Sequence, residues 1–266
     1  MNPSWKVPRH SVEFCQPKRT RHALLIPVLN EGERIVRQVE GLKSYSTQVD
    51  IYIVDGGSRD GVLEPGFLKD RGVCGLFTLR EPGGLSSQLR IGLATLLDRG
   101  YEGIILIDGN GKDGLTAIPR FVEALAAGWD HVQGSRFVPG GKAVHNPWKR
   151  VAGIKYVHAP LISLAAGFRY TDTTNGFRAY SRAFLLDPRV QPFRECFSRY
   201  ELHYYLAIRA ARLSFRVTEI AVERIYPATG KVPTKIRGLR GEALIIRTLL
   251  NACLGRFDPT DTEKHA

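Results

Sequence analysis

Acidic residues follow apolar runs at three places in the sequence, each close to glycine. Glu31 follows the run LLIPVLN, Asp55 follows DIYIV, and Asp108 follows IILI. Apolar runs of this length predict strands that are buried on both faces of a parallel sheet. The carboxyl ends of such strands border a crevice where ligands bind, and an acid there can hold a metal ion or a sugar hydroxyl. For Asp108, the alternative is that it caps the turn or helix that follows.

The loops after the first two runs are poorly suited to cradling a phosphate directly. Their glycines let backbone amides approach a ligand, but carboxylates dominate both loops. Asp55 instead suits the N–H donors of a nucleobase, or a ribose hydroxyl. No GxGxxG follows the first run, so we exclude a dinucleotide-binding dehydrogenase.

Strand-like and helical segments alternate through the first half of the chain. The strand-like segments begin HALLIPV, DIYIVD, GIILID and DHVQGS, and the segments with helical patterning are 34–45, 84–99 and 116–127. This alternation predicts βαβ units and a mainly parallel sheet. From about residue 139 the pattern is less regular. We predict one helix over 145–167, a turn and a short strand over 171–182, and a long helix over 199–215.

The composition indicates a folded, basic protein. The chain has 266 residues, is 43% hydrophobic and carries a formal net charge of +12, so it can bury a full core and favours an anionic partner. A nucleotide diphosphate, a lipid phosphate, a membrane surface and a nucleic acid are all anionic. We predict no nucleic-acid partner, because acids at three strand ends interrupt any continuous basic groove.

The four cysteines are far apart and form no CxxC pair, which argues against a zinc site or a disulfide scaffold. A reducing cytoplasm is the expected compartment. The basic first residues contain no apolar core of a signal peptide, and no run reaches the length of a membrane span.

Near the other end, KIRGLRGEALIIRTLLNACLGRF places leucines and isoleucines at near-helical spacing among basic residues. Such a helix either lies on anionic lipid with its cationic face or packs on the domain's own core.

Several motifs, taken in order, resemble the inverting family-two glycosyltransferases with the GT-A fold, and within them the branch related to dolichyl-phosphate sugar synthases. They cover roughly residues 22 to 236: PVLNE at 27–31, VDGGSRDG at 54–61, LIDGNGKD at 106–113, GSRF at 134–137, TNGFRAYSR at 174–182, RYELHYYLAIRA at 199–210 and VERIYPATGKVPTK at 222–235. The resemblance implies an α/β fold: a Rossmann-like, mainly parallel mixed sheet flanked by helices, with a C-terminal helical appendage.

The resemblance also implies a nucleotide-sugar donor site. Asp55 is expected near the base, Arg136 in a loop that closes over the diphosphate, and Arg224 with Lys235 in a mobile loop near the phosphates. The turn 175–178 is expected on the acceptor side. The donor-binding residues are predicted to be Pro27, Asn30, Glu31, Asp55, Asp60, Ser87, Asp108, Gly109, Ser135, Arg136, Arg178, Arg224 and Lys235.

The metal-binding element departs from the family pattern. Asp108 matches the first acid of the Asp-x-Asp element, but Asn110 replaces the second. A neutral amide oxygen predicts weaker binding of Mg²⁺ or Mn²⁺. Either Asp113 supplies a second carboxylate, or Lys112 neutralises the diphosphate; alternatively Lys112 points to solvent and Asp113 caps the next helix. The predicted metal ligands are Asp108, Asn110 and Asp113.

The implied reaction is an in-line displacement at the anomeric carbon, in which metal and basic side chains stabilise the departing nucleotide. A hydroxyl acceptor needs a general base, for which Glu201 is the first candidate and Asp172 the second. A polyprenyl phosphate is already ionised and needs none, which would leave Glu201 a positioning role. The other reading of Glu201 is a surface acid paired with Arg199 or Arg209.

We therefore expect a nucleotide-sugar-dependent, inverting hexosyltransferase whose donor carries UDP or GDP. Its acceptor would be a polyprenyl phosphate or a glycan, in cell-envelope polysaccharide or glycolipid synthesis. The competing interpretation is a catalytically silent relative that binds nucleotide or anionic lipid. We expect a cytoplasmic protein, or one at the inner face of the cell membrane with a peripheral contact through its C-terminal helix.

The predicted organisation has four parts: a flexible basic N-terminus over 1–21, the GT-A domain over 22–236, an amphipathic helix over 237–257 and a flexible tail over 258–266. His158 and His203 are expected to be packed or surface residues rather than ligands. Trp129, Trp148, Tyr204 and Tyr205 are expected in the core.

Overall fold

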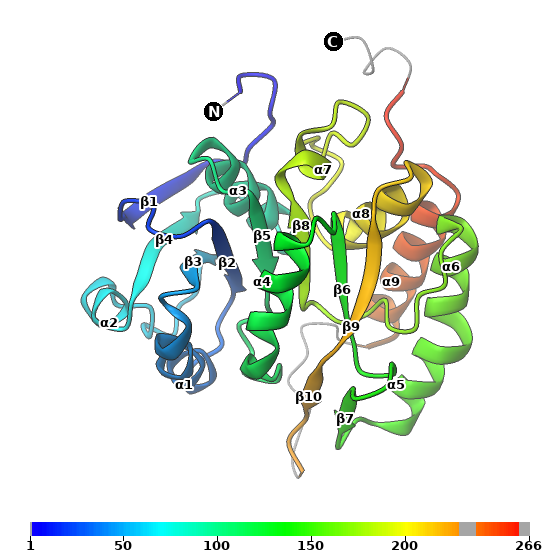
Figure 1. Cartoon of the computed structure of the whole chain (residues 1–266), viewed down its shortest axis with the longest axis horizontal. Coiled ribbons are helices and arrows are strands. Elements are labelled where there is room, and N and C mark those ends of the chain that lie inside the picture. The colour runs from blue at the N-terminus through cyan, green and yellow to red at the C-terminus, as the bar shows by residue number, and fades with distance from the viewer. Residues whose placement is uncertain (1, 229–237, 261–266) are drawn as a thin grey trace.

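The computed structural model describes residues 2–228 and 238–260. Its centre is an eight-stranded sheet in the order β1-β4-β3-β2-β5-β8-β6-β9 (Figure 1). The neighbours β4, β3, β2 and β5 run parallel, as do β6 and β9, while β1 and β8 run antiparallel to their neighbours. The strands are β1 (His10–Cys15), β2 (His22–Val28), β3 (Val49–Asp55), β4 (Val73–Leu79), β5 (Gly103–Leu106), β6 (His131–Ser135), β8 (Arg178–Ser181) and β9 (Val217–Ala221). The expected α/β class with a mainly parallel sheet is confirmed.

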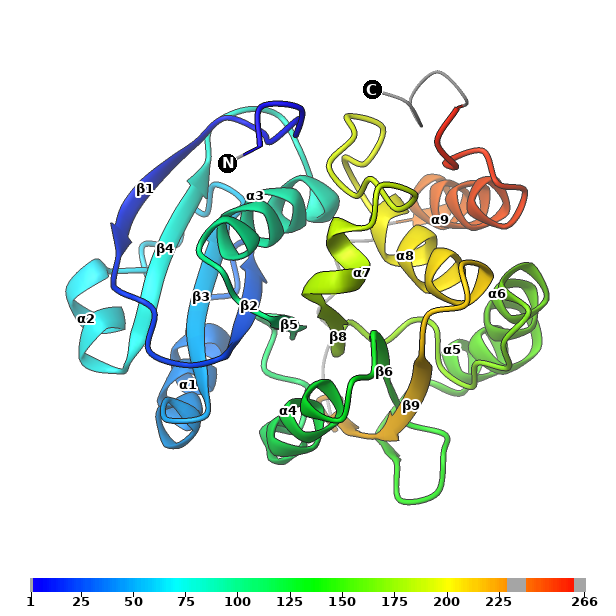
Figure 2. The ribbon, with the colours of Figure 1, turned by 45° about the horizontal axis from the view of Figure 1, so that its top comes forward.

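Helices cover both faces of this sheet, because its central strands are apolar along their whole length. The helices are α1 (Glu33–Leu42), α2 (Pro65–Asp70), α3 (Leu85–Asp98), α4 (Ile118–Ala126), α5 (Trp148–Gly153), α6 (Ala159–Ala166), α7 (Arg182–Leu186), α8 (Glu201–Arg212) and α9 (Gly238–Cys253). One core layer contains buried side chains of α1, α2 and α4. The other contains those of α3, α6, α8 and α9, and α3 lies beside α8 (Figure 2).

All four predicted strands form, as β2, β3, β5 and β6, and the short strand predicted in 171–182 forms as β8. The helix predicted over 145–167 is continuous from α5 through a π-helical segment, η3 (Ile154–His158), into α6. Short 3₁₀ turns, η1 (Lys43–Tyr45) and η2 (Leu115–Ala117), adjoin α1 and α4. A second small sheet pairs β7 (Lys142–Val144) with β10 (Glu223–Ile225) in parallel.

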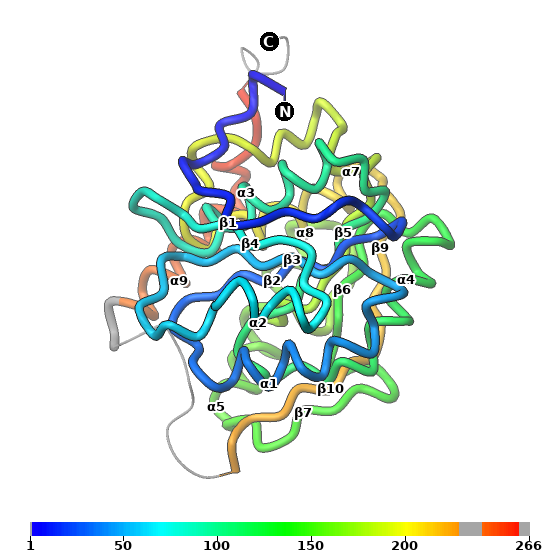
Figure 3. The backbone as a smooth tube through the Cα atoms, turned by 90° about the vertical axis from the view of Figure 1, so that its left-hand side faces the viewer, coloured from blue at the N-terminus to red at the C-terminus, as the bar shows by residue number. Residues whose placement is uncertain are grey.

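The expectation of a flexible N-terminus over 1–21 was wrong for residues 10–15. These residues form β1, which pairs with β4 at the edge of the main sheet (Figure 3). Its Phe14 is buried in the core, and the rest of the strand is held by its pairing with β4. The local pattern gave no strand signal, because most of the side chains of β1 remain accessible.

The C-terminal helix is shorter than the predicted 237–257 and runs over Gly238–Cys253. Leu249 is buried against the body of the protein, whereas Leu250 is exposed, so α9 both packs on the core and presents apolar side chains outward. The tail prediction for residues 261–266 lies outside the described residues.

Candidate active site

Three charged side chains meet at the carboxyl end of β5. The Arg224 guanidinium donates one hydrogen bond to Asp108 Oδ2 at 2.8 Å and another to Asp113 Oδ1 at 2.5 Å. Asp113 and Arg224 are almost fully buried, but a quarter of the Asp108 side chain remains exposed. Asp108 is therefore the member of this cluster that a ligand reaches first.

The backbone brings Arg224 to the two acids. Strand β10 lies against residues 112–114: Gly114 N–H donates to Glu223 O at 2.9 Å, and Ile225 N–H donates to Lys112 O at 2.8 Å. Asp113 and Arg224 are thereby paired in an antiparallel bridge. The Arg224 backbone is anchored, so only its side chain is free to change partner.

The pKa values of Asp108 and Asp113 are shifted in opposite directions. Burial alone would raise the pKa of Asp108, but the Arg224 charge and hydrogen bond hold it at about 2. Burial dominates at Asp113 and raises its pKa, and its Oδ2 atom has no hydrogen-bond partner. A buried carboxylate oxygen without a partner is what a bound cation would satisfy.

Lys112 is buried, which contradicts the alternative that it points to solvent. Its ammonium lies 5.0 Å from the centroid of the Tyr226 ring. Burial, with a smaller contribution from Arg224, lowers the pKa of Lys112 to about 8. The Asn110 amide donates to Asp108 Oδ2 at 3.2 Å, and its Oδ1 accepts from Lys112 N–H at 3.2 Å. Asn110 thus lies beside Asp108, with both ends of its amide hydrogen-bonded.

The two predicted nucleotide-binding loops are tied together by hydrogen bonds. Asp55 accepts from the Ser58 hydroxyl at 2.6 Å, and that hydroxyl oxygen accepts from Asn30 N–H at 2.8 Å. Asp60 accepts from Gly32 N–H at 2.8 Å. The loops after β2 and β3 therefore form one connected rim. Pro27 lies within β2, opposite Val54 of β3.

Two glycines let the backbone come close to the acidic cluster. A Cβ on Gly176 would lie 2.2 Å from Asp108 Oδ1, and one on Gly109 would lie 3.0 Å from Pro27 O.

The sequence analysis did not identify Gln38 of α1 as a residue of this site. Its amide donates to Asp108 O at 2.9 Å and accepts from Gly111 N–H at 2.9 Å, which clamps the loop after β5. The available signal was a glutamine at the helical spacing of Ile35 and Leu42, on the apolar stripe of α1.

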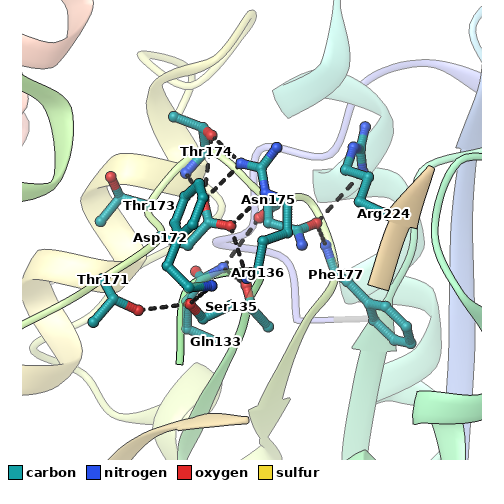
Figure 4. Close-up of polar contacts among 12 residues, drawn as sticks. Gln133, Ser135, Arg136, Thr171, Asp172, Thr173, Thr174, Asn175, Phe177 and Arg224 are labelled. Carbon is teal, nitrogen blue, oxygen red and sulfur yellow. Dashed lines mark hydrogen bonds and ion pairs between the residues drawn. The ribbon is translucent and has the colours of Figure 1, made fainter. Parts of the chain in front are cut away.

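Arg136 and Asp172 form a buried ion pair, shown with their neighbours in Figure 4. Arg136 Nε and Nη2 donate to the two carboxylate oxygens of Asp172 at 2.6 and 2.8 Å, and Nη2 also donates to Thr174 Oγ1. Burial alone would raise the pKa of Asp172, but these hydrogen bonds with Arg136 lower it. Arg136 is 3% exposed, so this pair fixes the loop after β6 from within.

Three other predicted donor residues face the protein interior. Arg178 donates to the backbone carbonyls of residues 173, 175 and 203, at 2.7 to 2.9 Å. The Ser135 hydroxyl lies 2.6 Å from the Thr171 hydroxyl. Ser87 of α3 donates to Ser198 O at 3.2 Å. These contacts give the three side chains structural partners that a sequence motif cannot reveal.

Glu201 is the first residue of α8, and its side chain binds the backbone of the segment that enters the helix. Its Oε2 atom accepts from the backbone N–H groups of Ser198 at 3.0 Å and Arg199 at 2.6 Å, and an acid at this position also complements the helix dipole.

The predicted donor residue Glu31 forms an ion pair with Arg34, with 2.7 Å between Glu31 Oε2 and Arg34 Nη2. Lys235 lies outside the described residues.

The remaining core predictions divide. His158 and His203 are buried, and burial lowers their pKa values to about 4 and about 3, so they are packed residues as expected. Tyr204 and Tyr205 are also in the core. The prediction for Trp148 was wrong: its side chain is 73% exposed at the start of α5.

Sequence comparison finds curated relatives. The chain is 31% identical over 168 residues to the polyprenol monophosphomannose synthase of Mycolicibacterium smegmatis, covering 62% of this chain and 63% of that protein. It is 28% identical over 224 residues to the undecaprenyl-phosphate mannosyltransferase of Micrococcus luteus, covering 83% of this chain and 90% of that protein. The match thus spans less than two thirds of the mycobacterial relative. No protein-family model matches the chain.

Structural comparison agrees with the fold. Glucosyl-3-phosphoglycerate synthase from Mycobacterium tuberculosis, solved with Mn²⁺, UDP and phosphoglyceric acid, superposes with a TM-score of 0.62. The two share 16% sequence identity, and the match covers 90% of this chain and 80% of that one. Together the comparisons show that the chain is similar in sequence to polyprenyl-phosphate mannose transferases, and they confirm the predicted GT-A fold.

Proposed function

We propose that this protein transfers a hexose, with inversion, from a nucleotide-diphosphate sugar to a polyprenyl phosphate. The observation that carries the proposal is the cluster of Asp108, Asp113 and Arg224 at the carboxyl end of β5, beside the rim made by the two connected loops. The names of the two curated relatives supply the acceptor class.

On the donor side, the connected loops offer carboxylate and amide oxygens to the base and ribose, with Asp55 and Asn30 at the rim. The diphosphate would lie over Asp108, where Arg224 and Lys112 supply positive charge. Charge that develops on the leaving nucleotide is best stabilised by groups held close to it, and the anchored backbone of β10 keeps the Arg224 guanidinium at this cluster.

The residues also fit a divalent cation, although the described part of the chain contains no group of three or more His, Cys, Asp or Glu side chains that could hold one. Asp108 is partly exposed, Asp113 Oδ2 is buried without a partner, and Asn110 adds a neutral oxygen. These three residues would hold Mg²⁺ or Mn²⁺, and glucosyl-3-phosphoglycerate synthase, which has a similar fold, was solved with each of these ions. When bound, the ion supplies charge neutralisation to the diphosphate.

The state of the two candidate bases favours a phosphate acceptor over a hydroxyl. Glu201 is engaged with two backbone amides, and Asp172 is locked in its ion pair with Arg136. A polyprenyl phosphate needs no base, because its oxygen is ionised at neutral pH. Glu201 then positions α8 and Asp172 positions Arg136.

A lipid acceptor requires contact with a membrane surface. In the described parts of the chain, no helix has the length and apolar character needed to cross one. Helix α9 exposes Ile246 at 54% and Leu250 at 43%, and it packs beside α6, whose Leu164 is 85% exposed. Together with the exposed Trp148 and Tyr156, these side chains support a peripheral contact that includes, but is wider than, the predicted C-terminal helix. The contact would lie at the inner face of the cell membrane.

The test is a transfer assay with undecaprenyl phosphate in detergent, using GDP-linked and UDP-linked hexoses, with and without Mn²⁺. We expect a glycolipid product with one of the donors, with the anomeric configuration inverted in its NMR spectrum, and loss of the product with Asp108→Asn. A product formed only on a glycan hydroxyl would overturn the acceptor assignment. Nucleotide binding without any transfer would favour the catalytically silent relative.

A further inference from the structure

The acidic pair of the candidate site already holds a cation of its own. We propose that Arg224 is the resident counter-cation of Asp108 and Asp113: it keeps a free divalent ion out, and it releases the pair only when a nucleotide diphosphate binds the guanidinium. This inference rests on the proposed function, since it assigns an order of binding to the same site.

The geometry shows that one guanidinium bridges both acids. Two different nitrogens are used, Nη2 toward Asp108 and Nη1 toward Asp113, and Nη1 also lies 3.4 Å from Asn175 Oδ1. A divalent ion that joined the two carboxylates would need the same space. Because two cations that share one small site repel each other, ion and guanidinium bind the pair in turn.

Burial keeps water from replacing either partner when Arg224 leaves the acids. The Arg224 side chain is 7% exposed and the Asp113 side chain 0%, so neither charge has water as a substitute partner. An arginine that leaves such a pair must find another anion at once. A diphosphate is that anion, because the planar guanidinium fork binds phosphate oxygens in a bidentate manner.

Both acids keep an oxygen that an ion could use after the exchange. Asp113 Oδ2 has no hydrogen-bond partner while Arg224 binds Oδ1, and a quarter of the Asp108 side chain is exposed. Since β10 is held to residues 112–114 by backbone hydrogen bonds, the side chain of Arg224 can turn while its backbone stays in place.

The test measures Mn²⁺ binding to the purified full chain, by the loss of the free-ion EPR signal, with and without GDP or UDP. We expect the native protein to bind Mn²⁺ well only when a nucleotide is present. Arg224→Gln should bind Mn²⁺ alone at least about tenfold more tightly than the native protein, and bind nucleotide more weakly. Equal Mn²⁺ affinity in the two proteins without nucleotide would overturn the proposal.

Arg150→Gln is the matched control. Arg150 lies near the same Tyr226 ring, and the substitution removes the same charge, but among the described residues Arg150 forms no hydrogen bond or ion pair with Asp108 or Asp113. It should bind Mn²⁺ as the native protein does. A gain equal to that of Arg224→Gln would overturn the proposal, because net charge alone would then explain the change.

Thermal melting guards against a folding artefact. Arg224→Gln leaves the carboxylates of Asp108 and Asp113 without their arginine and should melt at a lower temperature than the native protein. Mn²⁺ should raise the melting temperature of this variant more than that of the native protein.

Arg224→Lys keeps the charge but cannot span both acids, and it should give an intermediate Mn²⁺ affinity. A variant that Mn²⁺ does not stabilise would overturn the exchange. Transfer activity that persists while the exchange fails would leave the proposed function standing.

Discussion

The close approach of Gly176 to Asp108 predicts that a single methyl group there disrupts the candidate site. A Cβ at position 176 would lie 2.2 Å from Asp108 Oδ1, whereas real Cβ contacts are essentially never shorter than 3.0 Å. Gly176 does not have a positive φ, so the backbone itself tolerates alanine. In Gly176→Ala the carboxylate must therefore move by at least about 0.8 Å.

The structure sets the size of the effect. A shift of this size breaks or lengthens the 2.8 Å hydrogen bond between Asp108 and Arg224, and a hydrogen bond between charged groups contributes about 1.5–3 kcal/mol. We expect Gly176→Ala to lose about that much stability in urea unfolding. Because a displacement of about 1 Å at a reacting centre can cost about a hundredfold in rate, we expect a loss of transfer activity near that size.

The assay compares Gly176→Ala with Gly153→Ala in urea unfolding, in titration with GDP and UDP, and in transfer to undecaprenyl phosphate. Gly153 lies at the end of α5 with helical backbone angles, and a Cβ there meets nothing within 4 Å. The control should be neutral or up to about 1 kcal/mol more stable. If Gly176→Ala binds nucleotide and transfers sugar as the native protein does, then the Asp108 carboxylate is not at the reacting centre.

Three further predictions concern stability. Asp172→Asn should lower the free energy of unfolding in urea by about 3–5 kcal/mol, because it leaves Arg136 buried without its charge partner. The control Asp187→Asn removes a pair with the exposed Arg189 and should cost less than about 1 kcal/mol. Similar losses in the two variants would contradict the burial argument. Burial lowers the pKa of His158 from 6.5 to about 4, so the unfolded chain binds a proton at a higher pH than the folded protein does, and stability falls as the pH drops below about 6.5. At pH 5 this loss amounts to about 2 kcal/mol in the free energy of unfolding. His158→Gln should therefore reduce the difference in the free energy of unfolding between pH 7 and pH 5 by about that amount. An unchanged difference would show that His158 is protonated in the folded protein. Leu249→Ala should lower the free energy of unfolding by about 2–5 kcal/mol and Leu250→Ala by less than about 0.5 kcal/mol, since only Leu249 is buried. Equal costs would contradict the orientation of α9. In co-sedimentation with anionic vesicles, Leu250→Ala should bind less than the native protein.

Local sequence determined the parts of this protein that depend on neighbouring residues. The strands β2, β3, β5 and β6 are continuous apolar runs that end in polar residues and glycine, and a strand buried on both faces needs no distant information to be recognised. The same runs place Asp55 and Asp108 at carboxyl ends. Their position at the same edge of the sheet follows from chain direction alone, because the strands that precede them are parallel.

Strand β1 and the orientation of the arginines depended on the tertiary structure. Strand β1 is a polar edge strand that gains its hydrogen bonds from β4, more than 50 residues further along the chain. Arg178 and Arg136 have the same chemistry as a phosphate-binding arginine. The burial of one among backbone carbonyls and of the other against Asp172 is set by partners that the motif does not contain.

The acidic cluster shows the division most clearly. The sequence identified Asp108, Asn110, Asp113 and Arg224 individually, because each residue type suits a diphosphate or a metal ion. Only the folded chain shows that Arg224, 111 residues from Asp113, lies between the two acids. A carboxylate's preference for a cation is a local property, but which cation reaches it first is decided by the long-range pairing of β10 with the loop after β5.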